Sequence, residues 1–255
     1  MYAAERQQSI AAAVADHGRL SVAEIASTYD VTTETVRRDL TLLERAGFVR
    51  RVHGGVVPAR SLSMIEAAVA DRDSANAEQK DLIAEAALDL LPDPHGTLLL
   101  DAGTTTVRLA ARLPMDHPLT LITHSVPVAA RAVGLPHVDL HLLPGRVRST
   151  TQAAVGAETV AALSALRADV VMVGSNGVTE GLGLSTPDHD EAATKQAMVR
   201  SGRTVVALVD STKIGIESTH RFAELADVDV LVTDAGIDPA DRRALEKRGL
   251  EVRTT

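Results

Sequence analysis

The chain has no cysteine and few aromatic residues. Without cysteine it has no disulfide, thiolate nucleophile, iron–sulfur cluster or thiolate zinc site, and this absence fits a reducing compartment such as the cytoplasm. Aromatic residues make up 2% of the sequence: Tyr2, Tyr29, Phe48 and Phe222. Proteins that bind single-stranded nucleic acid use aromatic side chains as stacking platforms, so that class is disfavoured. Carbohydrate sites built on aromatic faces are disfavoured for the same reason.

Long hydrophobic runs are also missing. Runs such as VVMV (170–173) and VVALV (205–209) have the length of a strand and are too short to cross a bilayer. The first residues, MYAAERQQ, carry charge and no hydrophobic run, unlike a secretory signal. We therefore expect a cytoplasmic protein without a membrane partner.

Charge is distributed unevenly along the 255 residues, although the overall composition is ordinary for a protein with a sizeable core. The net charge is −8, yet residues 1–60 hold eight arginines against seven acidic residues. The basic residues of this segment concentrate at 37–60. A basic module joined to an acidic body can bind DNA despite the acidic total.

The N-terminal segment predicts a winged helix-turn-helix domain. Ser21 and Glu24 form a capping box at the start of its second helix. In the third helix, Val36, Leu40 and Leu43 recur at i, i+4 and i+7 and so share one buried face. Two β-prone runs around His53-Gly54-Gly55 then predict a hairpin, the wing. The three helices are expected at 7–15, 21–29 and 32–46, and the hairpin at 48–57.

The third helix and the wing hold the candidate DNA contacts. Because Val36 and Leu40 face the core, the adjacent Arg37 and Arg38 point elsewhere, and one can reach a base edge while the other holds a phosphate. The alternative is a solvated helix face, with Arg38 paired to Asp39 or Glu34. The wing residues have a similar alternative, since charge there also serves solubility. The candidate DNA-binding residues are Ser21, Thr33, Thr35, Arg37, Arg38, Arg50, Arg51 and His53.

From residue 77 onward, strand and helix patterns alternate. Several of the strands are continuously apolar, as expected for a mostly parallel sheet that is covered on both faces. This pattern predicts an α/β domain whose ligand lies beyond the carboxyl ends of the strands. The predicted strands are 97–101, 119–123, 138–143, 169–174, 204–210, 229–233 and 250–254. The predicted helices are 79–91, 104–113, 126–134, 156–166, 190–201 and 239–248.

Polar, glycine-containing loops follow five of these strands. DAGTTT (101–106) opens a helix, so its backbone amides and three hydroxyls can cradle a phosphate. The others are THS (123–125), PGRVRSTT (144–151), GSNG (174–177) and DSTKIG (210–215). Their convergence on one sheet edge predicts an anionic, hydroxyl-rich ligand, although α/β proteins place such caps there in any case. Lys213, Arg146 and Arg148 supply charge for a phosphate, and Asn176, Asp101 and Glu191 can bind hydroxyls.

Other chemistry finds little support. The fingerprints GxGxxG and GxxxxGK[ST] are absent, so a nucleotide is not the favoured ligand, and no GxSxG elbow anchors a serine nucleophile. Asp188-His189-Asp190-Glu191 is interpreted as a solvated loop followed by acids at a helix N-terminus rather than a metal site. His137 and His141 share one face of a strand without a third ligand, so we interpret them as structural.

TVRRDLTLLERAG (35–47) together with RRVHGG (50–55) closely resembles the DeoR/GlpR family of bacterial transcriptional regulators. The match continues through Lys80 with Ile83-Ala84, DAGTTT, THS, GSNG, the Glu191…Lys195 pair and DSTK, and so spans nearly the whole chain. The resemblance implies a C-terminal domain of the sugar-phosphate isomerase and CoA-transferase type that senses a phosphorylated sugar. It also implies a third helix that enters the major groove. The effector contacts that the resemblance implies are Gly103, Thr104, Thr105, Thr106, Asn176, Glu191, Lys195 and Lys213. With the loop candidates Asp101 and Arg146 they make up the predicted effector site.

The resemblance has two departures. His124 stands where the family more often has asparagine, and Ile214 stands where it has phenylalanine after the lysine of DSTK. We expect both residues at the edge of the pocket, where they bear on the identity of the effector.

These observations predict a winged helix-turn-helix domain at 1–58, a linker at 59–76 and an effector-sensing α/β domain at 77–255. We expect a repressor of carbohydrate-metabolism genes that binds double-stranded operator DNA as a homodimer or homotetramer, is relieved by a phosphorylated sugar and needs no cofactor. One alternative is an activator, or a regulator with a non-sugar effector such as a CoA ester or nucleoside. The other is a sugar-phosphate isomerase-like enzyme with Asp101 or Glu191 as its base.

Overall fold

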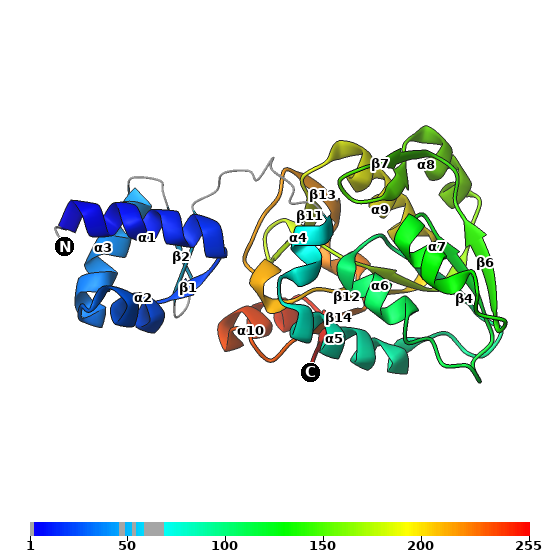
Figure 1. The fold of residues 1–255 in the computed structure, drawn as a ribbon, viewed down its shortest axis with the longest axis horizontal. Coiled ribbons are helices and arrows are strands. Elements are labelled where there is room, and N and C mark those ends of the chain that lie inside the picture. Colours follow the sequence, from blue (N-terminus) through cyan, green and yellow to red (C-terminus); the bar gives the residue numbers. More distant parts are fainter. Residues whose placement is uncertain (1–2, 46–48, 53–54, 59–68) are drawn as a thin grey trace.

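The computed structural model describes residues 3–45, 49–52, 55–58 and 69–255. Its N-terminal domain contains three helices and a small antiparallel sheet (Figure 1). The predicted buried face of the third helix is confirmed, because Val36, Leu40 and Leu43 are at most 5% exposed. They pack with residues of the other two helices, such as Ile10 and Ile25. The helices are α1 (Ala3–His17), α2 (Val22–Tyr29) and α3 (Thr33–Arg45).

The wing contains one strand more than the predicted hairpin. β2 (Val49–Val52) and β3 (Gly55–Pro58) form the hairpin, and β1 (Leu20–Ser21) pairs with the other side of β3. Glycine is required at position 55, because a Cβ there would collide with the backbone carbonyl of Leu20. Two residues are too short to show a β-period in sequence, so β1 emerges only from this pairing.

The second domain is built on a seven-stranded parallel sheet, and all seven predicted strands are present. The neighbouring strands that are consecutive in sequence, such as β4 and β5, are joined by helical crossovers, as parallel strands require. In sheet order the strands are β15 (Glu251–Thr254), β14 (Val230–Thr233), β12 (Gly202–Leu208), β9 (Ala168–Val173), β4 (Thr97–Leu100), β5 (Leu119–Thr123) and β6 (Val138–Leu142).

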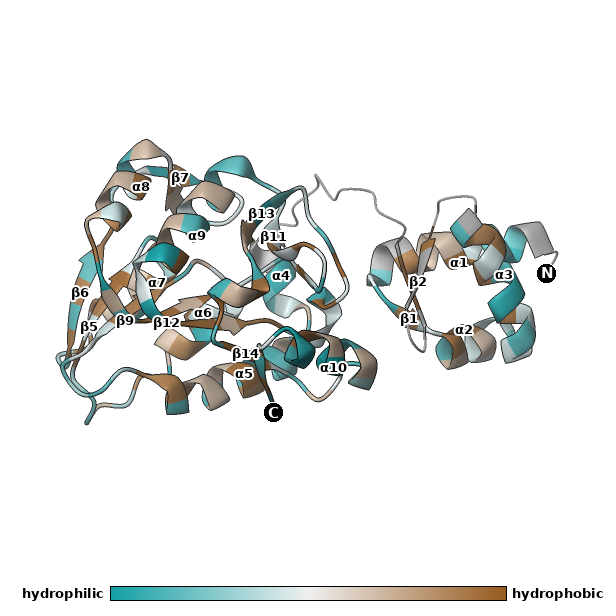
Figure 2. Cartoon of the chain, turned by 180° about the vertical axis from the view of Figure 1, so that it is seen from behind, coloured by the Kyte–Doolittle hydropathy of each residue, from teal (hydrophilic) through white to brown (hydrophobic). Residues whose placement is uncertain are grey.

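Three helices cover each face of this sheet. Along β9, Val171 and Val173 face one apolar core while Val170 and Met172 face the other, which explains the continuously apolar strands. Figure 2 shows this hydrophobic interior between the sheet and its helices. The first core is covered by α8 (Ala157–Ser164), α9 (His189–Ser201) and α10 (Pro239–Lys247), and the second by α5 (Ala77–Ala86), α6 (Thr104–Ala110) and α7 (Val126–Ala132). No helix in the described part of the chain is long and apolar enough to cross a membrane.

Short antiparallel strands occur in segments that the sequence predicts as loops. They contain three or four residues each, too few to show a clear β-period in the sequence. One group is β10 (Gly177–Thr179), β11 (Gly183–Thr186) and β13 (His220–Ala223), and the other is β7 (Arg146–Arg148) and β8 (Ala153–Val155). Three 3₁₀ turns complete the described elements: η1 (Ala87–Leu90), η2 (Ser211–Lys213) and η3 (Leu225–Asp227).

The segment predicted as a linker contains a helix, α4 (Val69–Ser74). It packs against α6, and Arg108 of α6 donates to the backbone carbonyl of Asp73 at 3.0 Å. The end of the 59–76 segment is therefore part of the α/β domain wall. A salt bridge also joins the two domains. Arg19 in the N-terminal domain lies 3.3 Å from Asp238, the residue that caps α10.

Candidate DNA-binding surface and effector pocket

Two arginines of α3 project from the N-terminal domain. The side chains of Arg37 and Arg38 are 55% and 80% exposed, and their nearest ion pairs are both with Glu34, at 3.7 and 3.8 Å. Ion pairs this exposed contribute about 0–1 kcal/mol each, so a phosphate can replace Glu34 at little cost. Thr33 is exposed at the start of the same helix. Three of the predicted DNA contacts therefore share the solvent-facing side of α3.

Asp39 fixes the direction in which these arginines point. Its carboxylate is buried and accepts hydrogen bonds from Arg6 Nε and Gln7 Nε2 of α1, both at 2.7 Å. The alternative in which Asp39 pairs with Arg38 is thus wrong, while the Glu34 alternative is present as a weak pair. Because α1 holds α3 through a buried pair, the exposed side of α3 is a rigid surface.

The remaining predicted DNA contacts are partly engaged within the domain. Ser21 Oγ accepts from the backbone N–H of Glu24 at 3.1 Å, so the predicted capping box is confirmed and the serine O–H is left to donate. Thr35 Oγ1 lies 2.9 Å from Thr32 Oγ1 at the start of α3. Arg50 and Arg51 are on β2, the outer strand of the wing, and His53 falls outside the described residues.

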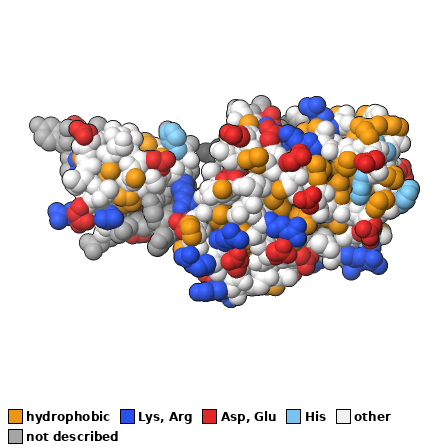
Figure 3. Space-filling model, turned by 90° about the horizontal axis from the view of Figure 1, so that it is seen from below, with side chains coloured by type: hydrophobic (Ala, Val, Ile, Leu, Met, Phe, Trp, Pro, Cys, Tyr) orange, Lys and Arg blue, Asp and Glu red, His pale blue; other side chains and the backbone are white. Residues whose placement is uncertain are grey.

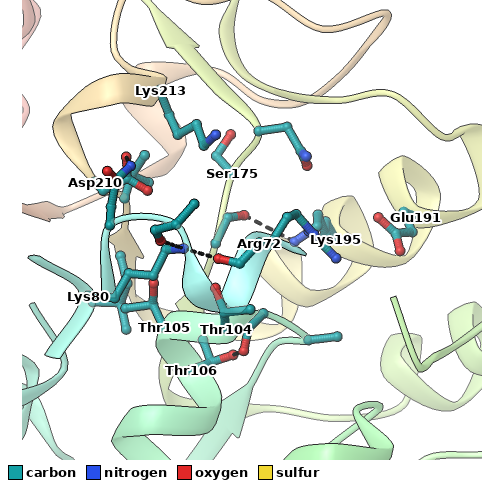
Figure 4. Close-up of a pocket in the computed structure, with 18 residues that line it drawn as sticks. Arg72, Lys80, Thr104, Thr105, Thr106, Ser175, Glu191, Lys195, Asp210 and Lys213 are labelled. Atoms are coloured by element: carbon teal, nitrogen blue, oxygen red, sulfur yellow. Dashed lines mark hydrogen bonds between the residues drawn. The ribbon is translucent and has the colours of Figure 1, made fainter. Parts of the chain in front are cut away.

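A cavity opens at the carboxyl ends of β4, β9 and β12, where the sequence predicts a ligand (Figure 4). Loops that follow these strands form its floor, and the α4–α5 segment and α9 form its walls. We call this cavity the effector pocket. Its lining residues are Arg72, Ala75, Asn76, Lys80, Ala102, Gly103, Thr104, Thr105, Thr106, Gly174, Ser175, Asn176, Glu191, Lys195, Leu208, Val209, Asp210 and Lys213.

The three threonines of the pocket have two different roles. Thr106 is fully buried, and its hydroxyl donates to the backbone carbonyls of Asp101 and Gly103, so it holds the loop in shape. The hydroxyls of Thr104 and Thr105 have no hydrogen-bond partner within the described residues and remain for a ligand. Thr106 therefore has a structural role, whereas the hydroxyls of Thr104 and Thr105 can bind a ligand.

Lysine is concentrated at this pocket. The chain has only four lysines, and Lys80, Lys195 and Lys213 all line the cavity. Lys80 donates to the backbone carbonyls of Arg72 and Ala75, and burial, the largest influence, lowers its pKa. Lys213 makes no side-chain hydrogen bond or ion pair with any described residue, and Figure 4 shows it directed toward Ser175. Lys213 is therefore available to an anionic ligand, in a cavity that it shares with Asp210 and Glu191.

Asp101 lies beneath the pocket rather than on its wall. It is fully buried, and its carboxylate accepts from Lys195 Nζ and from the backbone N–H of Gly174, the latter at 2.8 Å. Burial opposes ionisation, but Lys195 and the hydrogen bond with His124 outweigh it and hold the pKa of Asp101 well below its ordinary value. Asp101 thus anchors Lys195 and the loop after β9 and does not reach the cavity.

His124 and Ile214 are not pocket-edge residues, so that expectation is wrong. The ring of His124 is buried, with Nε2 2.9 Å from Asp101 Oδ1 and Nδ1 2.8 Å from the carbonyl oxygen of Ala154. Ile214 is buried in the first apolar core. Both side chains are used inside the protein.

Arg146 is also placed away from the pocket, contrary to the expectation. It is 65% exposed on β7 and pairs with Asp190 at 2.6 Å. Arg148, two residues further along on the same face of β7, is the arginine that meets Glu191, at 2.6 Å between Nη1 and Oε1. Glu191 lines the pocket with its carboxylate engaged by Arg148, and Asn176 lines it with Oδ1 accepting from Thr186 at 3.1 Å.

The pocket contains residues that the sequence does not single out as contacts. Lys80 belongs to the motif that carries the family resemblance, yet it precedes Lys213 by more than a hundred residues, and nothing local relates the two. Asp210 accepts from Asn76 Nδ2 at 3.2 Å and so ties the start of α5 to the loop after β12. The lining residues that are absent from the predicted contacts are Arg72, Ala75, Asn76, Lys80, Ala102, Gly174, Ser175, Leu208, Val209 and Asp210.

These features define a two-part regulator, a winged helix-turn-helix domain joined to an α/β sensor domain with a polar pocket. Two family models match the chain: a DeoR-like helix-turn-helix domain at residues 6–61 and a DeoR C-terminal sensor domain at residues 75–235. The chain belongs to the DeoR family of transcriptional regulators.

Two relatives match nearly end to end. The chain is 32% identical over 252 residues to the HTH-type transcriptional regulator GlpR of Haloferax volcanii, covering 99% of this chain and 98% of that protein. It is 33% identical over 232 residues to the lactose phosphotransferase system repressor of Staphylococcus epidermidis, covering 90% and 91%. Among solved structures, the ribose 5-phosphate isomerase A of Methanocaldococcus jannaschii aligns over 55% of each chain, with 17% identity and a TM-score of 0.41.

Proposed function

We propose that this protein is a cytoplasmic transcriptional repressor of carbohydrate-use genes that binds double-stranded operator DNA and releases it when a phosphorylated sugar occupies the effector pocket. The observation that carries the effector half is that Lys213, which has no ion pair with any described residue, lines the same cavity as the hydroxyls of Thr104 and Thr105. Relatives named as repressors, such as the lactose phosphotransferase system repressor of Staphylococcus epidermidis, support the repressor half.

For DNA, α3 enters the major groove with Arg37, Arg38 and Thr33 on its exposed side. One arginine reads a base edge while its neighbour, about 100° around the helix, holds a phosphate. Glu34 is their partner in the absence of DNA. Further contacts to the sugar-phosphate backbone of the DNA position the domain, and they come from Ser21, Thr35, Arg50, Arg51 and His53.

For the effector, the phosphate binds to Lys213, Thr104, Thr105 and the amides of the loop at Gly103. Charge-assisted hydrogen bonds of this kind are roughly twice as strong as neutral ones. Asn176, Ser175 and Asp210 line the same cavity and bind the sugar hydroxyls. An unphosphorylated sugar offers the Lys213 ammonium no anionic partner, so the proposal requires discrimination by the phosphate.

Release follows from the position of Lys80. Its ammonium holds the carbonyls of Arg72 and Ala75, at the end of the segment that leads from the DNA-binding domain. A phosphate near Lys80 and Lys213 competes for that ammonium and shifts the population of arrangements of α4. The shift in DNA affinity cannot exceed the effector's difference in affinity between the two arrangements.

The isomerase alternative is disfavoured because both of its candidate bases form ion pairs within the protein. Asp101 is buried against Lys195 and His124, and Glu191 is held by Arg148. A general base must reach the proton that it removes, and neither carboxylate is free to do so.

The test is a thermal-shift screen against sugar phosphates, the same sugars without phosphate, nucleotides and CoA esters, followed by operator titration with any hit. A ligand of the native state raises the melting temperature by mass action. Lys213→Met should reduce affinity for the sugar phosphate at least tenfold, as expected for one charged hydrogen bond of about 1.5–3 kcal/mol. Lys247→Met, which alters the one lysine outside the pocket, is the matched control. Stabilisation by CoA esters alone, or equal effects of the two variants, contradicts the proposed ligand.

A further inference from the structure

The two edges of the seven-stranded sheet are protected differently. At the β15 edge, Arg242 Nη2 of α10 donates to the backbone carbonyl of Val252 at 3.3 Å, and Arg253 is paired along the strand with Glu251 at 2.6 Å. At the other edge, β6 pairs with β5 on one side only among the described strands. An edge strand with unpaired backbone groups is a template for another strand.

The hydrogen bonds to β5 show which residues of β6 point to the open side. The amide of Leu119 donates to the carbonyl of His137 at 3.1 Å, and the amide of Leu143 donates to the carbonyl of Thr123 at 2.8 Å. In a parallel ladder alternate residues bond to one neighbour, so the odd-numbered residues of β6 face β5. The even-numbered residues Val138, Leu140 and Leu142 therefore direct their backbone groups outward.

Exposed hydrophobic side chains gather beside this edge. Leu142 of β6 is 53% exposed, Val126 of α7 is 41% exposed, and Val133, the C-cap of that helix, is 75% exposed. With the exposed Ala130 between them, the two valines form an apolar stripe at i, i+4 and i+7. Figure 3 shows hydrophobic and histidine side chains at the end of the molecule far from the N-terminal domain. No large hydrophobic side chain of β15 or α10 in the described residues is comparably exposed.

We propose that β6 pairs antiparallel with β6 of a second copy of this chain, around a two-fold axis at Leu140, so that one sheet runs through both subunits. The register is self-complementary: Asp139 lies opposite the partner's His141, and Val138 opposite the partner's Leu142. Asp139 and His141 are 76% and 58% exposed and face the same side of β6, 3.3 Å apart. This charge pattern recurs from both chains, as an isologous contact requires.

This pairing does not depend on the identity of the effector. It uses the outward amides of Leu140 and Leu142, whereas the amide of Val138 is already bonded to the carbonyl of Leu135 at 3.1 Å. Symmetric dimers of helix-turn-helix domains bind paired half-sites, and an interface in the sensor domain leaves both α3 helices free for DNA.

The absence of cysteine allows a direct test of the register by disulfide cross-linking. Opposed residues of a non-hydrogen-bonded antiparallel pair have Cα atoms about 4.5 Å apart, within disulfide range. Full-length Asp139→Cys and His141→Cys proteins are mixed and oxidised, and each is also oxidised alone. We expect a covalent dimer in the mixture and little in either protein alone. No cross-link in the mixture, or equal cross-linking by Arg253→Cys on β15, overturns the proposal.

Charge exchange supplies a second readout, by sedimentation equilibrium. His141→Asp places like charges opposite each other twice and should raise the dimer dissociation constant at least about tenfold. The double variant Asp139→His/His141→Asp restores an aspartate opposite a histidine at both positions and should recover the wild-type constant. Leu142→Asp should dissociate the dimer as well, and Arg253→Asp, the control on β15, should not. Melting curves check that each variant folds. A monomeric wild type, or a double variant no tighter than His141→Asp, overturns the register.

Discussion

The two candidate binding sites of this regulator depend mainly on different basic residues. Residues 1–60 contain eight arginines and no lysine, whereas the α/β domain contains all four lysines, three of them at the effector pocket. On α3, Arg37 and Arg38 are exposed and weakly paired with Glu34. In the pocket, Lys80 and Lys195 are buried and committed to protein acceptors.

This contrast has a physical reason. The planar guanidinium presents a fork of donors that matches base edges and phosphates at an exposed surface. The ammonium is a compact point charge that fits within a cavity, and its burial has to be offset by acceptors already in place. Changes to the exposed arginines are therefore expected to alter DNA binding. Changes to the buried cluster of Asp101, Lys195 and His124 are expected to alter the stability of the fold.

The largest effect is expected for Asp101→Ala. This change leaves the buried Lys195 ammonium without its carboxylate, and breaking such a pair costs about 3–5 kcal/mol. The free energy of unfolding in urea measures it. Asp190→Ala breaks the exposed pair with Arg146 and should alter stability by less than about 1 kcal/mol. Equal losses from the two variants would remove the distinction between buried and exposed pairs.

The pH dependence of stability should also show the stabilising effect of the Asp101 carboxylate. The native pKa of Asp101 is lowered, so the unfolded chain takes up the proton first. The stabilisation by its carboxylate is complete above the ordinary aspartate pKa of about 3.9 and is lost as the pH falls below it. Urea unfolding from about pH 6 to pH 3 should therefore show a steeper acid decline for the wild type than for Asp101→Asn. Identical slopes would contradict this assignment.

At the exposed surface, Arg38→Ala should weaken operator binding by about 1–3 kcal/mol if the side chain reads a base. Stability should change little, because its pair with Glu34 is exposed. Fluorescence anisotropy at fixed salt measures the affinity, since phosphate contacts depend strongly on ionic strength. Arg203→Ala, which removes a similarly exposed arginine paired with Asp169, is the control. Unchanged affinity would take Arg38 out of the interface.

The smallest effect separates two neighbouring threonines. Thr104→Val removes one hydroxyl that lines the pocket. It should weaken the binding of the sugar phosphate by about 1 kcal/mol and leave stability and DNA binding unchanged. Thr106→Val removes the hydrogen bonds to the carbonyls of Asp101 and Gly103 and should lower stability instead. Calorimetric titration and melting curves distinguish the two. The reverse assignment of effects would contradict the roles described for the loop.

Much of the fold follows from local pattern. The spacing of Val36, Leu40 and Leu43 identifies the buried face of α3, and the continuously apolar strands identify a parallel sheet covered on both sides. Ser21 with Glu24 marks the start of α2. These features depend on residues within a few positions of one another, and local propensity and periodicity express such relations directly.

The errors share a different cause. The sequence cannot distinguish Arg146 from Arg148, because which of them meets Glu191 depends on how β7 is set against α9. It cannot place His124 under the pocket, because the contact with Asp101 joins the ends of two strands. β1 is absent from the prediction because its partner β3 is distant in sequence, and β10, β11 and β13 are absent because strands of three or four residues show little β-period.

By itself, the sequence determined the two-domain plan, the helices and strands of the main sheet, and the loops from which a ligand site is built, since these depend on short-range periodicity and capping. Only the tertiary structure decided which polar groups form hydrogen bonds or ion pairs within the protein and which remain available to a ligand. That division assigns Thr106, Asp101 and Lys195 to support, and Thr104, Thr105 and Lys213 to the cavity. It depends on contacts between residues up to about a hundred positions apart, which packing alone brings into hydrogen-bond range.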